Sequence, residues 1–416
     1  MIKKNKLFIL LIALGVIIRL LLMVSTYHSD LAGQIISSYF FAYKNVINIY
    51  DFLANMPADQ TLIRNFGLSD IFIYPPLTYF TLGGWLKLIQ PLTSEKFFLD
   101  VMSGISVYKI PNFNYYLFIL KLPYLIVDLL MAFSLTKLFD KNSDKKLVAL
   151  LWLFNPVTLY ASFSMGVFDI IPALFTVLSL VFLKKNRVLM AALMLGFGAA
   201  YKSYPLFLLP LLVLSQRSIW SKIKTAFIGA LPFVASNLPF WSSAAYKYMV
   251  FGPKSQKQFF MIWLVSGGEG IFPYLLGFVI LCLIASRDKN SAKKMYAYFL
   301  AFFLLLFSVT NYHPQWFIWI APFFVIELVM NRLRNIWLTL ILFGCYVAIV
   351  LLFENSLSAG LFAPVWPDLN NFPGFAKIIS AKTDLGFFKS GIRSLFAGIS
   401  LYLSYDILNL KEKDNS

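Results

Sequence analysis

Four ionisable residues stand at the ends of apolar segments, where they could take part in chemistry. Asp30 closes the sequence YHSD and Asp169 closes SMGVFD, while Lys202 lies in YKSYP and His313 in TNYHPQW. A carboxylate can accept a proton from a hydroxyl group, and ammonium or imidazole groups can stabilise a departing anion. The four residues could therefore carry out a group transfer to a hydroxyl, provided that the chain brings them to one face.

Each residue also has a structural explanation. Asp30 and Asp169 both precede a predicted helix, so a capping role and a chemical role fit each of them equally well. Lys202 could simply extend along apolar surface to reach water. A single histidine in aromatic surroundings, such as His313 or His28, is more often a packing residue. Only the convergence of these residues on one face favours function.

The composition indicates a protein of the lipid bilayer. Of the 416 residues, 59% are hydrophobic and only 13% are charged, and the mean hydropathy is +0.74, which is typical of a polytopic membrane protein. The net charge of +17 does not indicate nucleic-acid binding, because Lys and Arg occur in short clusters between apolar segments. Cys282 and Cys345 lie inside apolar segments, which argues against a disulfide framework and against a cysteine-based metal site.

The sequence predicts about twelve membrane-spanning helices, since about twenty mainly apolar residues cross the hydrocarbon. The first segment, from Leu7 to about Thr26, lacks the short apolar core and cleavage site of a signal peptide, so we expect a retained helix. The other segments are approximately 115–138, 147–166, 168–183, 188–202, 204–216, 224–240, 264–286, 295–311, 315–330, 336–353 and 390–409.

Residues 73–92, IYPPLTYFTLGGWLKLIQPL, are nearly apolar enough to form a further span, and the distribution of positive charge argues against it. If they do not cross, the segments 1–6, 137–146, 184–187, 216–224, 287–294, 331–335 and the tail from 411 all lie inside. These segments hold more than half of the 36 basic residues, as the excess of Lys and Arg in cytoplasmic loops requires. We therefore expect short interfacial helices at 73–92, within one long outer loop from residue 28 to about 114.

A second interfacial helix is predicted in this loop over residues 36–53. Its apolar residues share one helical face, opposite a polar face that includes Lys44 and Asp51. The apolar set is Ile36, Phe40, Tyr43, Ile47, Tyr50 and Leu53. A loop helix packed against the rest of the domain is the alternative.

Three charges lie deeper in the predicted spans: Arg19, Lys121 and Asp128. Charges within a bilayer are costly and normally face the bundle interior, where they find partners. Lys121 and Asp128 are two helical turns apart, too far for a direct pair on an ideal helix. We expect each to have a partner on another helix, with a structural role for Asp128.

Several segments resemble a known group of membrane enzymes. Residues 151–212 are similar to the corresponding part of the catalytic subunit of glycosylphosphatidylinositol mannosyltransferase I. IFIYPPLTYF resembles its Tyr-x-Tyr-x-Pro-Leu segment, LPYLIVDLL its helix with Asp before Leu-Leu, and SVTNYHPQWFIWIAPFF its Thr-x-x-Tyr-Phe-x-Trp region. The Tyr-Pro-Pro-Leu-Thr and Asn-Pro elements, with AAYKSYP, also resemble the dolichyl-phosphate-glucose glucosyltransferases of N-glycan assembly. Both groups belong to the GT-C class of glycosyltransferases.

The resemblance implies a fold and an activity. It implies an all-α polytopic membrane protein, a GT-C-like bundle whose long first outer loop carries interfacial helices. It also implies transfer of a sugar, mannose first, from a polyprenyl-phosphate donor to a glycan or glycolipid acceptor. This chain departs from the mannosyltransferase pattern, since His28-Ser29-Asp30 stands in place of Asp-x-Asp. It also has Ile73 where the glucosyltransferases carry an Asp before Tyr-Pro-Pro, with Asp70 nearby.

These residues suggest an inverting transfer on the outer membrane face. Asp30, the best match to the acidic residue of the family, would act as base, while Lys202 and His313 would bind the donor phosphate. Asp169 would orient sugar hydroxyls or Lys202, and aromatic rings would stack on sugar faces. His28, Asp70, Tyr74 and Trp316 complete the expected substrate-binding set. Because polyprenyl phosphate is a good leaving group, the reaction needs neither a metal nor a cofactor.

A transporter or flippase for a lipid-linked or sugar substrate is the alternative function. Transporters usually show related halves and midplane sites at broken helices, and no internal repeat is visible here. We expect a catalytic module at 1–240 and a variable C-terminal membrane module at 241–416. No outer loop has an Asn-x-Ser/Thr acceptor, which favours a bacterial cytoplasmic membrane, with an accessory membrane subunit as a further candidate partner.

Overall fold

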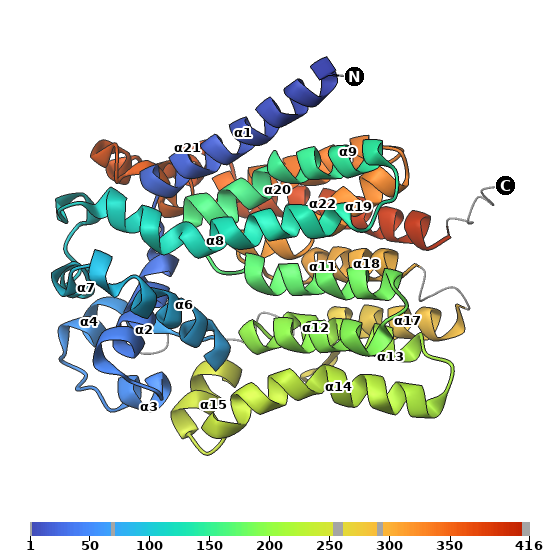
Figure 1. The fold of residues 1–416 in the computed structure, drawn as a ribbon, viewed down its shortest axis with the longest axis horizontal. Coiled ribbons are helices and arrows are strands. Elements are labelled where there is room, and N and C mark those ends of the chain that lie inside the picture. The colour runs from blue at the N-terminus through green and yellow to red at the C-terminus, as the bar shows by residue number, and fades with distance from the viewer. Residues whose placement is uncertain (1, 68–70, 253–260, 289–293, 410–416) are drawn as a thin grey trace.

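The computed structural model describes residues 2–67, 71–252, 261–288 and 294–409. Most of these residues are helical, and the longer helices lie side by side in a bundle (Figure 1). Four helices are long and apolar enough to cross a membrane, and seven shorter apolar helices accompany them. The four are Lys6–Ser25, Phe113–Thr136, Asn142–Met165 and Ile219–Phe240. The prediction of a mostly helical membrane protein is confirmed, whereas the number of about twelve spans stays a prediction.

The first part of the bundle is built from the N-terminal helix and from a series of helices that begins after the long loop. Its members are α1 (Ile2–Ser25), α8 (Phe113–Thr136), α9 (Asn142–Leu153), α11 (Ile170–Lys184), α12 (Val188–Tyr201), α13 (Leu209–Leu214) and α14 (Ile219–Asn237). The turns after α8, α11 and α13 lie at the same end in Figure 1. The Lys184 ammonium ties two of them together, 2.8 Å from the Asp140 carboxylate. The clusters of basic residues at 137–146, 184–187 and 216–224 thus share one end of the bundle, which we call the turn end.

The second part completes the core. Its helices are α17 (Pro273–Arg287), α18 (Met295–Val309), α19 (Ala321–Met330), α20 (Ile336–Leu351) and α22 (Leu385–Asn409). Phe299, Phe303 and Phe323 belong to one apolar cluster with residues of α11 and α12. Both predicted modules therefore share a hydrophobic core.

The long loop starts and finishes at the same end of the bundle, which we call the loop end. Asn114, at the start of α8, donates a hydrogen bond of 2.6 Å to the carbonyl of Val24 at the end of α1. Between them, α6 (Pro76–Leu88) lies with the other loop helices at this end (Figure 1), where the Thr78 hydroxyl donates a hydrogen bond of 2.9 Å to the carbonyl of Tyr201 at the end of α12. This place agrees with the expectation that residues 73–92 do not cross, which stays a prediction.

The loop helices are packed more deeply than expected. They are α2 (Ser29–Lys44), α3 (Ile49–Ala54), α4 (Thr61–Phe66), α6 and α7 (Glu95–Met102). The prediction of one helix over 36–53 is wrong, because Asn45 takes a left-handed conformation (φ 54°) and ends α2. Helix α2 is buried almost all round, so it packs within the domain, while Ile47 of the predicted apolar face is 67% exposed.

The span expected at 264–286 also begins differently. Strands β1 (Trp263–Ser266) and β2 (Glu269–Ile271) form an antiparallel hairpin. Gly267 and Gly268, with φ of 51° and 89°, make its turn, because glycine adopts positive φ without steric cost. Pro273 then begins α17, where its missing N–H is tolerated.

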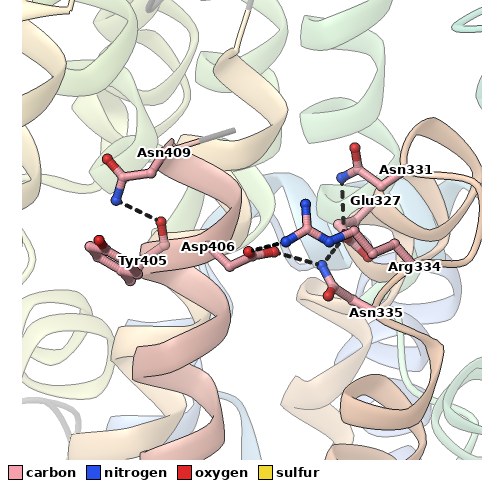
Figure 2. Close-up of polar contacts among 7 residues, drawn as sticks. All are labelled: Glu327, Asn331, Arg334, Asn335, Tyr405, Asp406 and Asn409. Atoms are coloured by element: carbon pink, nitrogen blue, oxygen red, sulfur yellow. Dashed lines mark hydrogen bonds and ion pairs between the residues drawn. The ribbon is translucent and has the colours of Figure 1, made fainter. Parts of the chain in front are cut away.

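A polar cluster at the turn end holds α19, α20 and α22 together (Figure 2). The buried Glu327 accepts hydrogen bonds from the amides of Asn331 and Asn335 at 3.1 and 2.8 Å. Asn335 also donates to Asp406, which is paired with Arg334 at 2.6 Å. The turn end therefore carries a buried carboxylate in addition to its clusters of basic residues.

Candidate functional site

The predicted site residues meet at the loop end of the bundle. Burial lowers the pKa of His313, and four charged or titratable neighbours act on it: Asp30, His28, Lys202 and Asp169. These residues come from the start of α2, the turn before α11, the end of α12 and the turn after α18. The convergence expected from sequence is therefore present.

Asp30 lies in the first turn of α2 and is accessible. His28, rather than Asp30, caps this helix, because its Nδ1 accepts a hydrogen bond of 3.2 Å from the Asp30 backbone N–H. The Asp30 carboxylate is 32% exposed and lies 3.5 Å from the same ring nitrogen. The capping explanation for Asp30 is therefore wrong, and its carboxylate can still meet a substrate hydroxyl.

Asp169 is fully buried beside two donors. Its Oδ1 accepts hydrogen bonds from Lys202 Nζ at 2.7 Å and from Trp319 Nε1 at 2.6 Å. It occupies the capping position of α11 but makes no capping hydrogen bond. Its Oδ2 is buried without a hydrogen-bond partner among the described residues. Such an atom is costly to leave unpaired, and it can accept a hydrogen bond from a bound hydroxyl.

Lys202 does not extend along apolar surface to reach water. Its side chain is 11% exposed and pairs with Asp169. Four aromatic rings surround the ammonium, with centroids 5.0 to 5.6 Å from Nζ. These rings are Tyr74, Phe168, Trp316 and Trp319. Cation–π attraction and the ion pair together fix the ammonium in place.

The two histidines of the chain lie next to each other, with ring centroids 6.1 Å apart. Burial lowers the pKa of His28, and the charges of Asp30 and Glu354 only partly oppose this effect. Because Nδ1 of His28 accepts a hydrogen bond, its proton belongs on Nε2. That Nε2 and Nδ1 of His313 are buried, and within the described parts of the chain neither has a partner.

The remaining predicted residues divide into two groups. Tyr74 and Trp316 line the site through their rings, and Trp316 stacks on Trp319 with centroids 5.0 Å apart. Asp70 lies outside the described residues, so its place in the substrate-binding set stays a prediction.

Sequence reasoning missed two features of the site. Trp319 is the second donor to Asp169, and its position three residues after Trp316 is a signal that could have pointed to it. The other feature is the π-helix Leu159–Met165, which no residue pattern predicted. Such helices are rare in proteins overall, but those that occur are often at functional sites.

An apolar cavity of about 450 Å³ adjoins the site. Tyr160 and Ser164 of the π-helix line one wall, and Tyr346 and Val350 of α20 line another. The backbone N–H of Tyr27 donates a hydrogen bond of 2.9 Å to the carbonyl of Leu361, which also lines the cavity. The cavity therefore lies next to the chain segment that leads to Asp30.

The deeper charges have partners, as expected. Arg19 Nε donates to Asp128 Oδ2 at 2.6 Å, and Trp152 Nε1 donates to Asp128 Oδ1 at 2.9 Å. Both ions are fully buried. Lys121 finds its partners among backbone carbonyls outside its own helix. The expectation of cross-helix partners is confirmed for both residues.

The comparisons with known proteins point to one family. No curated protein matches the chain. The family model of glycosyltransferase family 87 matches residues 115–268, a region that includes Lys121, Asp169 and Lys202 but neither Asp30 nor His313. The match does not single out glycosylphosphatidylinositol mannosyltransferase I. Over somewhat more than a third of its length, the chain is similar to a GT-C-like family of membrane glycosyltransferases.

Proposed function

We propose that the chain is an integral membrane glycosyltransferase that moves a hexose from a polyprenyl-phosphate donor to a glycan or glycolipid acceptor. The observation that carries this proposal is an accessible carboxylate, Asp30, beside the buried pair of Asp169 and Lys202. The match of residues 115–268 to a glycosyltransferase family supports the class of reaction. Mannose is the hexose that the resemblance favours.

Asp30 acts as the general base. The acceptor oxygen attacks the anomeric carbon and its proton passes to the Asp30 carboxylate, while the bond between that carbon and the phosphate oxygen breaks. The new glycosidic bond forms on the opposite face, so the configuration inverts. A positioned base contributes about 10²–10⁴ in rate. With 32% of its side chain exposed, Asp30 can receive an acceptor from water.

Lys202 and His313 bind the departing phosphate. Because Asp169 and four rings already hold the Lys202 ammonium, little reorganisation is needed when negative charge develops. Of the two roles expected for Asp169, this arrangement supports orientation of Lys202. Its free Oδ2 leaves room for the other role, acceptance of a sugar hydroxyl.

The apolar cavity suits the lipid part of the donor. An isoprenoid chain requires an apolar surface, and the wall formed by Val350, Leu351 and Leu361 provides one. Leu361 also accepts a hydrogen bond from the backbone N–H of Tyr27, three residues before Asp30. The cavity would thus lead the lipid away from a head group held near Asp30, with the site facing outward from a bacterial cytoplasmic membrane.

The decisive experiment uses radiolabelled polyprenyl-phosphate mannose. Full-length protein in proteoliposomes receives the donor and a mixture of membrane glycolipids, and label in product is measured. We expect Asp30→Asn to fold normally and to lose at least 99% of transfer, or about 10²-fold. Asp59→Asn, which alters an exposed acid in the same loop, serves as the matched control and should retain activity.

Two outcomes would overturn the proposal. Substantial transfer by Asp30→Asn would move the base to Asp70 or Asp169. Movement of labelled donor across the bilayer without formation of a glycosidic bond would indicate a transporter or flippase.

A further inference from the structure

Helix α8 carries a buried polar stripe that faces the site. Lys121, Tyr124 and Asp128 follow one another at spacings of three and four residues, which places them on one face of the helix. All three are at most 1% exposed. Asp128 is paired with Arg19, whereas the partners of Lys121 within the described parts of the chain are backbone carbonyls and not a carboxylate.

Lys121 joins two segments that are far apart in the sequence. Its ammonium donates to the carbonyl of Thr26 at 2.6 Å and to the carbonyl of Phe163 at 2.8 Å. The Thr26 hydroxyl also donates to the Phe163 carbonyl, at 3.2 Å. Thr26 lies just after α1, and Phe163 lies in the last turn of the π-helix. One ammonium therefore caps the carboxyl ends of two helices, where carbonyls lack helical partners and a cation is favoured.

Each of these carbonyls is followed closely by an acid of the site. The chain continues from Thr26 to Asp30, and from Phe163 to Asp169. Gly166 lies between the latter two, with φ of 76°, and a Cβ there would be only 2.7 Å from Cε of Lys121. The turn that leads to Asp169 therefore packs directly against the Lys121 side chain.

Tyr124 extends the same connection to α2. Its hydroxyl donates to the Gln34 side-chain oxygen at 2.8 Å, and the Gln34 amide donates to the Asp30 carbonyl at 3.2 Å. Lys121 and Tyr124 therefore hold the Asp30 segment from both sides. Its contacts are all buried or partly buried, so water does not replace them easily.

We infer that Lys121 is a positioning residue that fixes the Asp30 segment relative to the Asp169 segment. This inference rests on the proposed function for its effect on rate, but the geometry itself is independent of the substrate. An apolar residue at this position would remove the ammonium donor of the Thr26 carbonyl and would leave the Phe163 carbonyl with only the 3.2 Å hydrogen bond from the Thr26 hydroxyl. The two segments could then move apart. A displacement of about 1 Å can cost about 10² in rate.

The first test is kinetic and compares variants at two positions of the same helix. With the radiolabelled donor, Lys121→Met should lower kcat by at least about 10-fold and leave the donor KM within about 2-fold, because alignment rather than binding is lost. Lys121→Arg, which keeps the donors, should recover part of kcat. Asp128→Asn should lower thermal stability at least as much while keeping kcat. Equal kcat in Lys121→Met and wild type, or an equal loss in Asp128→Asn, would overturn the inference.

The second test needs no substrate. Amide hydrogen exchange, followed by mass spectrometry of the full chain in detergent, should become faster in Lys121→Met over residues 26–31 and 163–169. In Asp128→Asn we expect faster exchange near residues 15–19 and 152–154. Unchanged exchange at 26–31 and 163–169 in both Lys121 variants would overturn the positioning role. If wild-type protein shows no transfer, the proposed function fails while this exchange result still decides the role of Lys121.

Discussion

Two buried pairs of acid and cation differ in whether both oxygens of the carboxylate are hydrogen-bonded. In the pair of Arg19 and Asp128, both carboxylate oxygens accept a hydrogen bond, and Arg19 also donates to the carbonyls of Gly15 and Leu153. In the pair of Lys202 and Asp169, Oδ1 accepts two hydrogen bonds while Oδ2 accepts none within the structure described. Among the described residues, the unpaired atom of the first pair is a donor, Nη2 of Arg19, so its carboxylate is closed. The second pair instead has a carboxylate oxygen left for a ligand.

The two pairs also differ in how deeply they are buried. The first pair is fully buried inside the helices that span the bundle, whereas Lys202 is 11% exposed at the loop end. A buried ion pair is weak evidence for stability by itself, because desolvation offsets attraction. The unpaired Oδ2 of Asp169 is more informative, because a buried acceptor without a hydrogen bond is retained only at a cost in stability. We therefore assign the first pair to architecture and the second to substrate.

The largest effect is expected from breaking the pair of Arg19 and Asp128. Asp128→Ala leaves the Arg19 guanidinium buried without its counter-charge, and we expect about 3–5 kcal/mol of lost stability. Unfolding of the purified protein in mixed detergent micelles would measure it. As control, the double variant Arg19→Met with Asp128→Leu should recover most of the loss. No recovery would mean that the pair does more than hold helices together.

The second effect tests the pair of Lys202 and Asp169, and we expect it mainly on activity. Asp169→Asn removes the charge that holds Lys202, and we expect a fall in kcat of about 10²–10³, the scale of a lost preorganised electrostatic contact. Stability should fall less than in Asp128→Ala, because Lys202 can turn towards water. The transfer assay with radiolabelled donor measures the first quantity, and thermal unfolding the second. A variant that is unstable but fully active would reverse the comparison.

A smaller effect concerns pH. Burial lowers the pKa of His28 below its ordinary value of 6.5, so below this pH the unfolded chain binds more protons than the folded one. The contribution of His28 to the free energy of unfolding is fully present above pH 6.5. It is lost as the pH falls, by up to about 1.4 kcal/mol per pH unit. His28→Asn, which can still cap α2, should reduce the fall in melting temperature between about pH 7 and about pH 5.5. If the melting temperature of the variant falls as steeply with pH as that of the wild type, other groups cause the fall.

The smallest effect is expected at the turn end. Glu327→Gln keeps the shape of the side chain that Asn331 and Asn335 contact, and removes a buried charge (Figure 2). We expect a change in stability within about 1 kcal/mol, because a neutral hydrogen bond replaces a charged one whose desolvation is costly. Transfer activity should stay unchanged, as this cluster lies at the far end from Asp30. A large loss of activity would connect the two ends.

The sequence by itself determined the membrane class, the positions of most helices and the end at which the site lies. Apolar length and the distribution of Lys and Arg report directly on the cost of placing residues in hydrocarbon, so a count along the chain is enough. The same reasoning predicts that residues 73–92 do not cross, and α6 lies with the loop helices at the loop end. It failed at residues 36–53, because the left-handed Asn45 and the burial of α2 depend on neighbours that periodicity does not describe.

Only the tertiary structure decided which polar atoms are paired. The hydrogen bond between Asp169 and Trp319 joins residues 150 positions apart, and the one between Arg19 and Asp128 joins residues 109 positions apart. At the ends of helices, spacing along the chain does not fix distance in space. Capping by His28, the ring cage around Lys202 and the two carbonyls held by Lys121 therefore come from packing, which alone brings these segments within hydrogen-bond range.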